Sequence, residues 1–135
     1  MATTRALLHG SAPLGTHVSA LPPGLFLLRT PREWESSWKA MTKGITPSPD
    51  LPPVDWTSEV VVLLVLGFRA TGGYGITITD VVTRWHHLEV HATEERPGDG
   101  MVTEAETMPV HAVAAPIAAV RDTLLLIQRV VTRTG

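Results

Sequence analysis

The stretch EVVVLLVLG, residues 59–67, decides the fold prediction because seven successive positions in it, Val60 to Leu66, are apolar. A short apolar run without polar alternation, closed by a glycine, is typical of a strand that is buried on both faces. The run is far shorter than the ~20 residues that a membrane-spanning helix needs. It therefore predicts the central strand of a sheet that is covered on both faces.

The chain on both sides of this run predicts further strands. They are expected at residues 24–29, 74–82, 84–93, 102–113 and 122–132, where apolar residues alternate with polar ones or form short runs. Pro109 cannot donate to a ladder, so the 102–113 segment is predicted to lie at a sheet edge. Residues 94–100 are expected to form a turn-rich loop and 114–121 a bend, while 122–132 reads as apolar on both faces in its first half.

One helix is predicted, from Pro31 to about Lys43. The segment Thr30-Pro-Arg-Glu33 reads as a capping box, in which the threonine hydroxyl accepts from an early helix N–H and the glutamate reaches back to the N-cap amide. Apolar residues at helical spacing, Trp34, Trp38 and Met41, form one stripe that is expected to pack on a sheet. The four prolines of residues 44–56 then predict an extended connector.

These elements add up to a mainly β (α+β) fold. We predict an antiparallel β-sandwich or open barrel of about six or seven strands with one N-terminal amphipathic helix. Residues 1–23 are small, polar and turn-rich and are expected to be a partly ordered arm, and residues 24–135 are expected to form a single domain.

Composition narrows the classes of function. The chain has 135 residues, 11 basic and 13 acidic, with a net charge of −2, which gives no electrostatic reason to expect nucleic acid. It has no cysteine, which removes disulfides, thiol nucleophiles and zinc–thiolate sites. The N-terminus does not read as a signal peptide, and the compartment stays open.

Two clusters could carry chemistry. The glycine-rich segment GFRATGGYGI, residues 67–76, suggests a phosphate loop, but a strand-like segment and not a helix follows it, so Gly72 and Gly73 are expected to supply positive φ in a strand-to-strand loop. The second cluster is His87, Glu89 and His91, which share one strand face and form a metal candidate if a further ligand such as His111 joins them. No serine lies in a nucleophile elbow, and we expect neither an enzyme nor a cofactor.

Four motifs together resemble a known family. They are Asp55-Trp56 before the apolar strand, the glycine segment 67–76, an E-x-x-P-G turn at 94–98, and T-x-P-V-H at 107–111. This order resembles the C-terminal domain of the protease complex subunit PrcB family over about residues 25–121, with Ala70 standing where proline is usual. The resemblance implies an accessory, non-catalytic subunit whose partner is a protein, with a protease complex as its setting, and family members are often exported.

The glycine loop is the predicted contact surface. Arg69 and Tyr74 are expected to touch the partner, while Thr71, Gly72 and Gly73 shape the backbone. One alternative is a protease inhibitor, because RATGGY also looks like the NPTTGY loop of chagasin-type inhibitors. The other is a metal-binding protein that uses the His87/Glu89/His91 face. The two strands that are apolar on both faces would also suit a homodimer interface.

Overall fold

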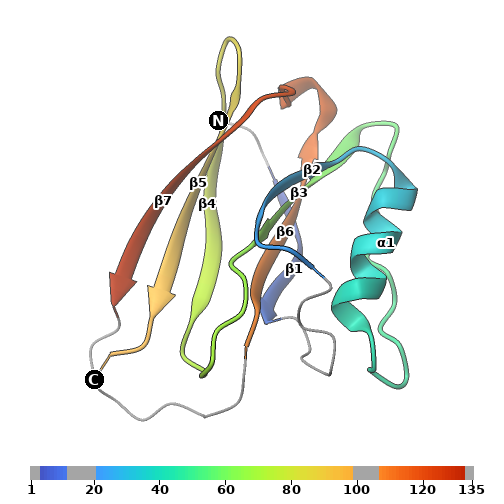
Figure 1. Ribbon diagram of the computed structural model, residues 1–135. Helices are drawn as coiled ribbons and strands as arrows, with labels where there is room; N and C mark the ends of the chain where they lie inside the picture. Colours follow the sequence, from blue (N-terminus) through green and yellow to red (C-terminus); the bar gives the residue numbers. More distant parts are fainter. Residues whose placement is uncertain (1–3, 12–20, 99–106, 133–135) are drawn as a thin grey trace.

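The computed structural model describes residues 4–11, 21–98 and 107–132. Within these residues the fold comprises seven strands in two sheets and one α-helix (Figure 1). In chain order the elements are β1 (Arg5–Ser11), β2 (Gly24–Leu28), α1 (Pro31–Thr42), β3 (Glu59–Val65), β4 (Gly75–Thr83), β5 (Leu88–Arg96), β6 (Pro109–Pro116), the short 3₁₀ helix η2 (Ile117–Ala119) and β7 (Leu124–Thr132). The described strands do not close into a barrel, and the predicted mainly β sandwich-like fold is confirmed.

The larger sheet has the order β1-β6-β3-β2 and is antiparallel throughout. Strand β3, which takes up most of the apolar run of residues 60–66, lies inside this sheet and is buried from Val60 to Val65, as predicted. Strand β6 is its other interior strand, so the expectation of an edge position for this segment is wrong. Pro109 is the first residue of β6, a position at which a missing N–H interrupts no ladder.

The smaller sheet has the order β4-β5-β7. Strands β4 and β5 are antiparallel, but β7 pairs with β5 in the parallel direction, which departs from the expected all-antiparallel arrangement. The register of β4 shifts between Ile78 and Asp80, so one residue bulges there. These three strands lie side by side in Figure 1, with β7 at the outer edge.

Several boundaries differ from the prediction. Residues 84–87, expected to begin a strand, form the β4–β5 turn, which is closed by the Arg84 N–H donating to the His87 carbonyl. Strand β5 then runs on to Arg96, so Glu94 lies in a strand and not in a loop. Strand β6 likewise continues to Pro116, into the expected bend. Residues 102–106 of the predicted strand lie outside the described residues.

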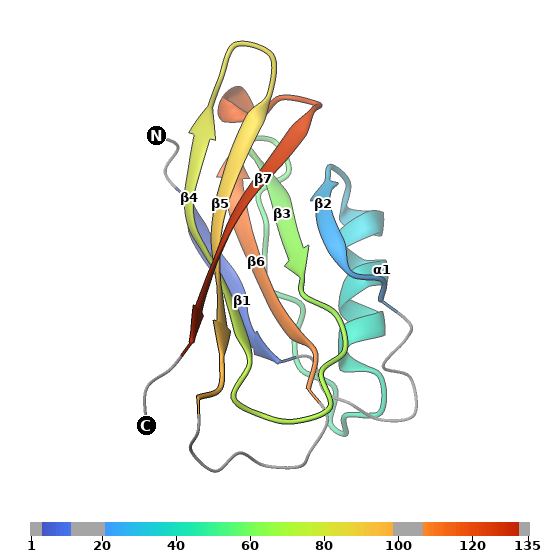
Figure 2. The same cartoon turned by 60° about the vertical axis from the view of Figure 1, so that its left-hand side comes forward.

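The large sheet lies between two apolar layers (Figure 2). On one side β3 contributes Val60, Val62 and Leu64 to a core shared with β4, β5 and β7. On the other side Val61, Leu63 and Val65 join Trp34 and Met41 of α1. Both faces of β3 are therefore occupied, which explains the absence of polar alternation in its sequence.

The helix begins and ends as its sequence indicates. Thr30 is the N-cap and accepts from the Glu33 N–H at 3.2 Å, and Gly44 follows the C-cap with φ of 90°. The glutamate accepts from the amide of Arg29, one residue before the predicted N-cap amide. The indole N–H groups of Trp34 and Trp38 donate to carbonyls of the proline-rich connector and tie it to the helix.

The N-terminal arm contributes a strand. Residues 5–11 form β1 and pair with β6 along its free side, with an irregular register between Ala6 and Leu8. The described structure of residues 1–23 is thus part of the large sheet, which begins earlier in the chain than Gly24. None of the helices among the described residues is long and apolar enough to cross a membrane.

A histidine pair joins the two sheets. His111 of β6 is 6% exposed, and its Nδ1 accepts the N–H of Ile78 in β4 at 2.8 Å. His9 of β1 stacks on it with ring centroids 4.2 Å apart, and its Nε2 donates to the Ile76 carbonyl. Because Nδ1 is an acceptor, His111 is neutral in this arrangement. Burial, together with the charge that His9 can carry, lowers the pKa of His111 to about 4.

This pair predicts a dependence of stability on pH. The unfolded chain takes up a proton at this histidine near its ordinary pKa of 6.5, whereas the folded chain does so only near pH 4, so stability falls as the pH drops between these values. The loss reaches at most about 3 kcal/mol. In His111→Asn the amide oxygen replaces Nδ1 as acceptor but does not titrate, so urea unfolding should show a smaller loss in this variant between pH 7 and about pH 4.5. An equal loss in both proteins would contradict this role of His111.

Candidate functional site

The glycine loop joins β3 of the large sheet to β4 of the small sheet. Its backbone turns at Gly67, with φ of 98°, and at Gly73, with φ of 88°. A Cβ on Gly67 would also come within 3.1 Å of the Pro23 side chain, a tight contact that adds to the preference for glycine set by its positive φ. Gly72 is buried and has no positive φ, which corrects the expectation that it works as Gly73 does.

Backbone hydrogen bonds hold the middle of the loop. The Arg69 N–H donates to the Thr107 carbonyl at 2.7 Å, and the Thr107 N–H donates back at 2.8 Å. The Thr107 hydroxyl donates to the Thr71 carbonyl at 2.9 Å. Thr107 is therefore the residue that ties the loop to the segment entering β6, and it opens the T-x-P-V-H motif.

Arg69 is turned toward the protein. Its Cζ lies 5.5 Å from the centroid of the Tyr74 ring, and its Nη1 donates to the carbonyl of Phe68. Its Nη2 lies 3.9 Å from Glu94 Oε1, which is an electrostatic contact and not a hydrogen bond. The side chain keeps 28% of its surface exposed. Arg69 and Tyr74, the two residues predicted to contact a partner, thus contact each other within the chain.

Glu94 lies behind these residues and is 3% exposed. Its carboxylate accepts from Arg96 Nε at 2.6 Å and from Gln128 Nε2 at 2.9 Å. The sequence did not indicate this centre, because Glu94 falls in the segment predicted as a loop, residues 94–100. The alternation of Leu88, Val90 and Ala92 could have revealed it, since continuing that pattern by one step places Glu94 on the buried face.

Phe68 is the residue of the loop that points an apolar group outward. It is 49% exposed, the neighbouring Ala70 is exposed too, and Thr71 and Tyr74 are half-buried. Phe68 lies within the predicted loop, but the sequence alone did not single it out. The candidate site is therefore the exposed Phe68 ring on a loop whose backbone is hydrogen-bonded to Thr107 and whose Arg69 side chain contacts Tyr74.

The second predicted cluster is also assembled, on the outer face of the small sheet. Glu89 accepts from Arg84 Nε at 2.8 Å, and its two oxygens lie 3.2 Å from His87 Nε2 and 3.0 Å from His91 Nε2. These contacts, with Arg84 first, lower the pKa of Glu89 to about 2. Since the carboxylate oxygens already accept from these donors, the arrangement is an ion-pair cluster.

The metal alternative gains no support from this geometry. His111, considered as a further ligand, is engaged between the sheets and does not join His87 and His91. Within residues 4–11, 21–98 and 107–132 no group of three histidine, cysteine, aspartate or glutamate side chains is placed to hold a metal ion.

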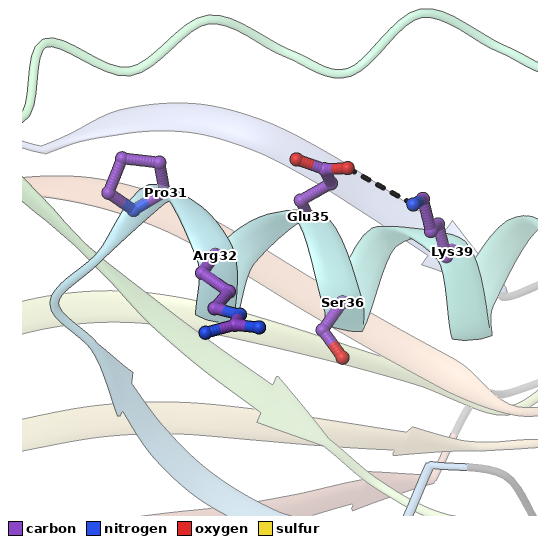
Figure 3. Close-up of a pocket in the computed structure, with 5 residues that line it drawn as sticks. All are labelled: Pro31, Arg32, Glu35, Ser36 and Lys39. Carbon is purple, nitrogen blue, oxygen red and sulfur yellow. Dashed lines mark ion pairs between the residues drawn. The ribbon is translucent and has the colours of Figure 1, made fainter.

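A shallow hollow beside the first turns of α1 offers little chemistry. It is lined by Pro31, Arg32, Glu35, Ser36 and Lys39 (Figure 3). Glu35 and Lys39 form an ion pair of 3.1 Å between exposed side chains one helical turn apart, while Arg32 and Ser36 point away from that pair. Such a pair adds only a few tenths of a kcal/mol to a helix, and the hollow holds no buried polar group that could select a ligand.

Comparison with known families finds a match that covers the glycine loop and the strands around it. Residues 60–116 match the family model described as PrcB C-terminal. The matched segment runs from β3 through the glycine loop to the end of β6, and it confirms the resemblance seen in the sequence. Comparison with curated proteins and with solved structures finds no match.

The buried carboxylate predicts a stability effect at the base of the loop. In Glu94→Gln an amide N–H₂ replaces one oxygen and faces donors from Arg96 or Gln128, so unfolding free energy should fall by about 1–3 kcal/mol. Urea unfolding at neutral pH measures this. Glu35→Gln is the matched control, because its exposed pair with Lys39 should leave stability unchanged. Equal stability of the two variants would show that Glu94 does not anchor the loop.

Proposed function

We propose that this chain is a non-catalytic protein-binding domain of the accessory kind that the PrcB resemblance implies. The family match over residues 60–116 supports this class of function, because it covers the strands and the loop that build the candidate site. The partner is a protein, and a protease complex is the setting that the resemblance implies. The contact surface centres on the loop from Phe68 to Tyr74.

The observation that carries the proposal is the exposure of Phe68 on an immobilised backbone. A half-exposed phenylalanine ring loses apolar hydration when a partner covers it, and aromatic residues are frequent anchors of interfaces. The hydrogen bonds to Thr107 hold the loop before binding, so little conformational entropy is lost on association. A rigid loop with an outward aromatic ring is therefore suited to binding a preformed pocket.

The other loop residues have supporting roles in this proposal. The exposed part of Arg69 provides a polar contact next to Phe68. Its guanidinium lies over the Tyr74 ring and so does not cover the Phe68 ring. Thr71 accepts the Thr107 hydroxyl through its carbonyl, and Gly73 provides the turn into β4. Gly72 is buried, which limits it to shaping the backbone.

A catalytic role is not part of the proposal, because the ionised groups with shifted pKa values have structural partners. Hydroxyls of Thr57 and Ser58 lower the pKa of Asp55, and Arg5 lowers that of Glu59. Glu89 is held by Arg84 and His91. Each carboxylate accepts hydrogen bonds that stabilise its charge, from hydroxyls at Asp55 and from arginines at Glu59 and Glu89, which accounts for the shifts by structural contacts.

Phe68→Ala tests the proposed contact. Truncating an interface anchor costs on the order of 2 kcal/mol, so the affinity for the partner should fall by about 10- to 30-fold. The tagged chain is used to isolate a partner, which is then purified and titrated against native and variant proteins. Ile117→Ala is the matched control, because Ile117 is also exposed, at 39%, and lies in η2 outside the loop.

The outcome separates the readings of the loop. Equal binding by native and Phe68→Ala proteins, with the fold intact by circular dichroism, would remove the loop from the proposed interface. Inhibition of purified papain-like or subtilisin-like proteases by the native chain, lost in Phe68→Ala, would replace the accessory role with the inhibitor role. The titration measures affinity for the partner and the inhibition assay measures substrate turnover by the protease, so each role is tested separately.

A further inference from the structure

Strand β1 is the strand of the large sheet that contributes least to the core. It lies at an edge, pairs only with β6 among the described strands, and has an irregular register between Ala6 and Leu8. From Arg5 to Gly10 only Leu7 and Leu8 are half-buried, and the rest are exposed. Local opening costs least where few apolar contacts are lost, so β1 can open at a lower free energy than the sheet as a whole.

The order of the sheet allows β1 to leave by itself. In β1-β6-β3-β2 the strands β1 and β2 lie at opposite edges, so separating β1 breaks the β1–β6 ladder and no other. The buried members of the two apolar clusters on either side of β3 come from other elements, and none of them belongs to β1. The core therefore stays intact when β1 separates.

Two polar side chains hold β1 to elements other than β6. At the start of the strand Arg5 pairs with Glu59 of β3 at 2.8 Å, and because the arginine is about half exposed, this pair adds little to stability. Near the end of the strand His9 Nε2 donates to the Ile76 carbonyl of β4 at 3.1 Å. The histidine contact is thus the main polar link between β1 and the small sheet.

His9 also covers a buried histidine. His9 and His111 are directly opposite in the register, and their rings stack with centroids 4.2 Å apart. His9 is exposed, whereas His111 is 6% exposed and accepts the Ile78 N–H at its Nδ1. While β1 is in place, His111 can take up a proton only inside the protein and at the cost of that hydrogen bond. Removal of β1 uncovers the ring, which can then ionise in water.

We propose that β1 is a strand released by acid: in mildly acidic solution it separates from β6 while the rest of the domain stays folded. Protonation drives the release because two charged rings at the stacking distance repel each other, whereas the released chain places both in water. Release leaves the edge of β6 without a partner strand from Pro109 to Ala114. The inference concerns β1 alone and stands whether or not the glycine loop binds a partner.

Few charged groups lie on the strands around the histidine pair. In β5, Glu94 is bound by Arg96 and Gln128. Apart from burial, the charge that lowers the pKa of His111 is that of His9, and no carboxylate of the described residues raises it. The strands β1, β3, β4 and β6 carry three charged side chains besides the two histidines: Arg5 of β1, Glu59 of β3 and Asp80 of β4.

Hydrogen exchange of the full chain, followed by NMR in urea below the unfolding transition, tests the release. The amides of β1 should exchange through an opening with a much weaker urea dependence than the amides of β3, because local opening exposes little surface. After correction for intrinsic exchange rates, the opening constant of β1 should rise about 20-fold from pH 7 to pH 5, since His111 titrates near 6.5 when uncovered and near 4 when covered. A urea dependence equal to that of β3 would overturn the proposal.

His111→Asn links the opening to the buried histidine. The asparagine oxygen can accept the Ile78 N–H but does not titrate, so the opening constant of β1 should change less than about threefold over the same pH range. His86→Asn is the matched control, because His86 is exposed on the β4–β5 turn, and this variant should keep the full rise. An equal rise in the native chain and in His111→Asn would contradict the proposal.

A disulfide between β1 and β6 gives a second test that leaves both histidines in place. Leu8 and Ala112 are directly opposite in the register, and Leu8 packs against the apolar cluster that contains Ala112. In this cysteine-free chain Leu8→Cys combined with Ala112→Cys therefore places two sulfurs within bonding reach. The oxidised protein should lose the opening of β1 between pH 7 and pH 5, and reduction should restore it. An undiminished rise in the oxidised protein would rule out release of the strand.

Discussion

The constraint on which this structure depends is that its larger sheet is apolar on both faces. Along β3, Val61, Leu63 and Val65 face α1, while Val60 and the residues alternating with it face the smaller sheet. Fully burying one such side chain stabilises the fold by about 1.5–3 kcal/mol, so neither face can be left in water. Each face of the sheet needs a layer that packs against it, and the two layers differ in secondary structure. The helix and its proline-rich connector cover one face, and β4, β5 and β7 cover the other.

The need for two covers places the candidate site. After β3 the chain leaves the buried sheet and enters the sheet that covers it, so the loop between them spans the end of the sandwich. A loop in that position is fixed on its inner side by hydrogen bonds to Thr107, with Glu94 lying 3.9 Å from Arg69, and is open on its outer side, where Phe68 lies. The glycines serve the crossing itself, since Gly67 lies against Pro23 and Gly73 turns into β4.

Local patterns predicted the elements that local physics determines. The capping residues Thr30 and Glu33 gave the correct start of α1, and the apolar run gave β3, because capping and periodicity act over a few residues. Strand β6 was misplaced because Pro109 was read as a bar to an interior strand, whereas it stands at the first residue, where no ladder bond is lost. The parallel pairing of β7 with β5 joins segments of the chain separated by β6, and no local signal encodes it.

The site was predictable to the level of the loop and not of the side chains. RATGGY indicates the loop between β3 and β4, but the surroundings of its side chains include Glu94, a buried carboxylate on β5 that lies 3.9 Å from Arg69 and far from it along the chain. Arg69 contacts that carboxylate and the Tyr74 ring, whereas Phe68 is 49% exposed.

The pairing of β7 could not be predicted for the same reason, because its partner strand lies far from it along the chain. Strands β4 and β5 are joined by a tight turn that sets their register, and the bulge in β4 arises within that pair. Strand β7 follows β6 in the chain and pairs with the side of β5 that β4 leaves free, which makes it an edge of the small sheet. Its inward residues Leu124 and Leu126 serve the core, as the apolar composition requires. Its outward residues Leu125 and Ile127 stay 46% and 42% exposed and take no part in that core.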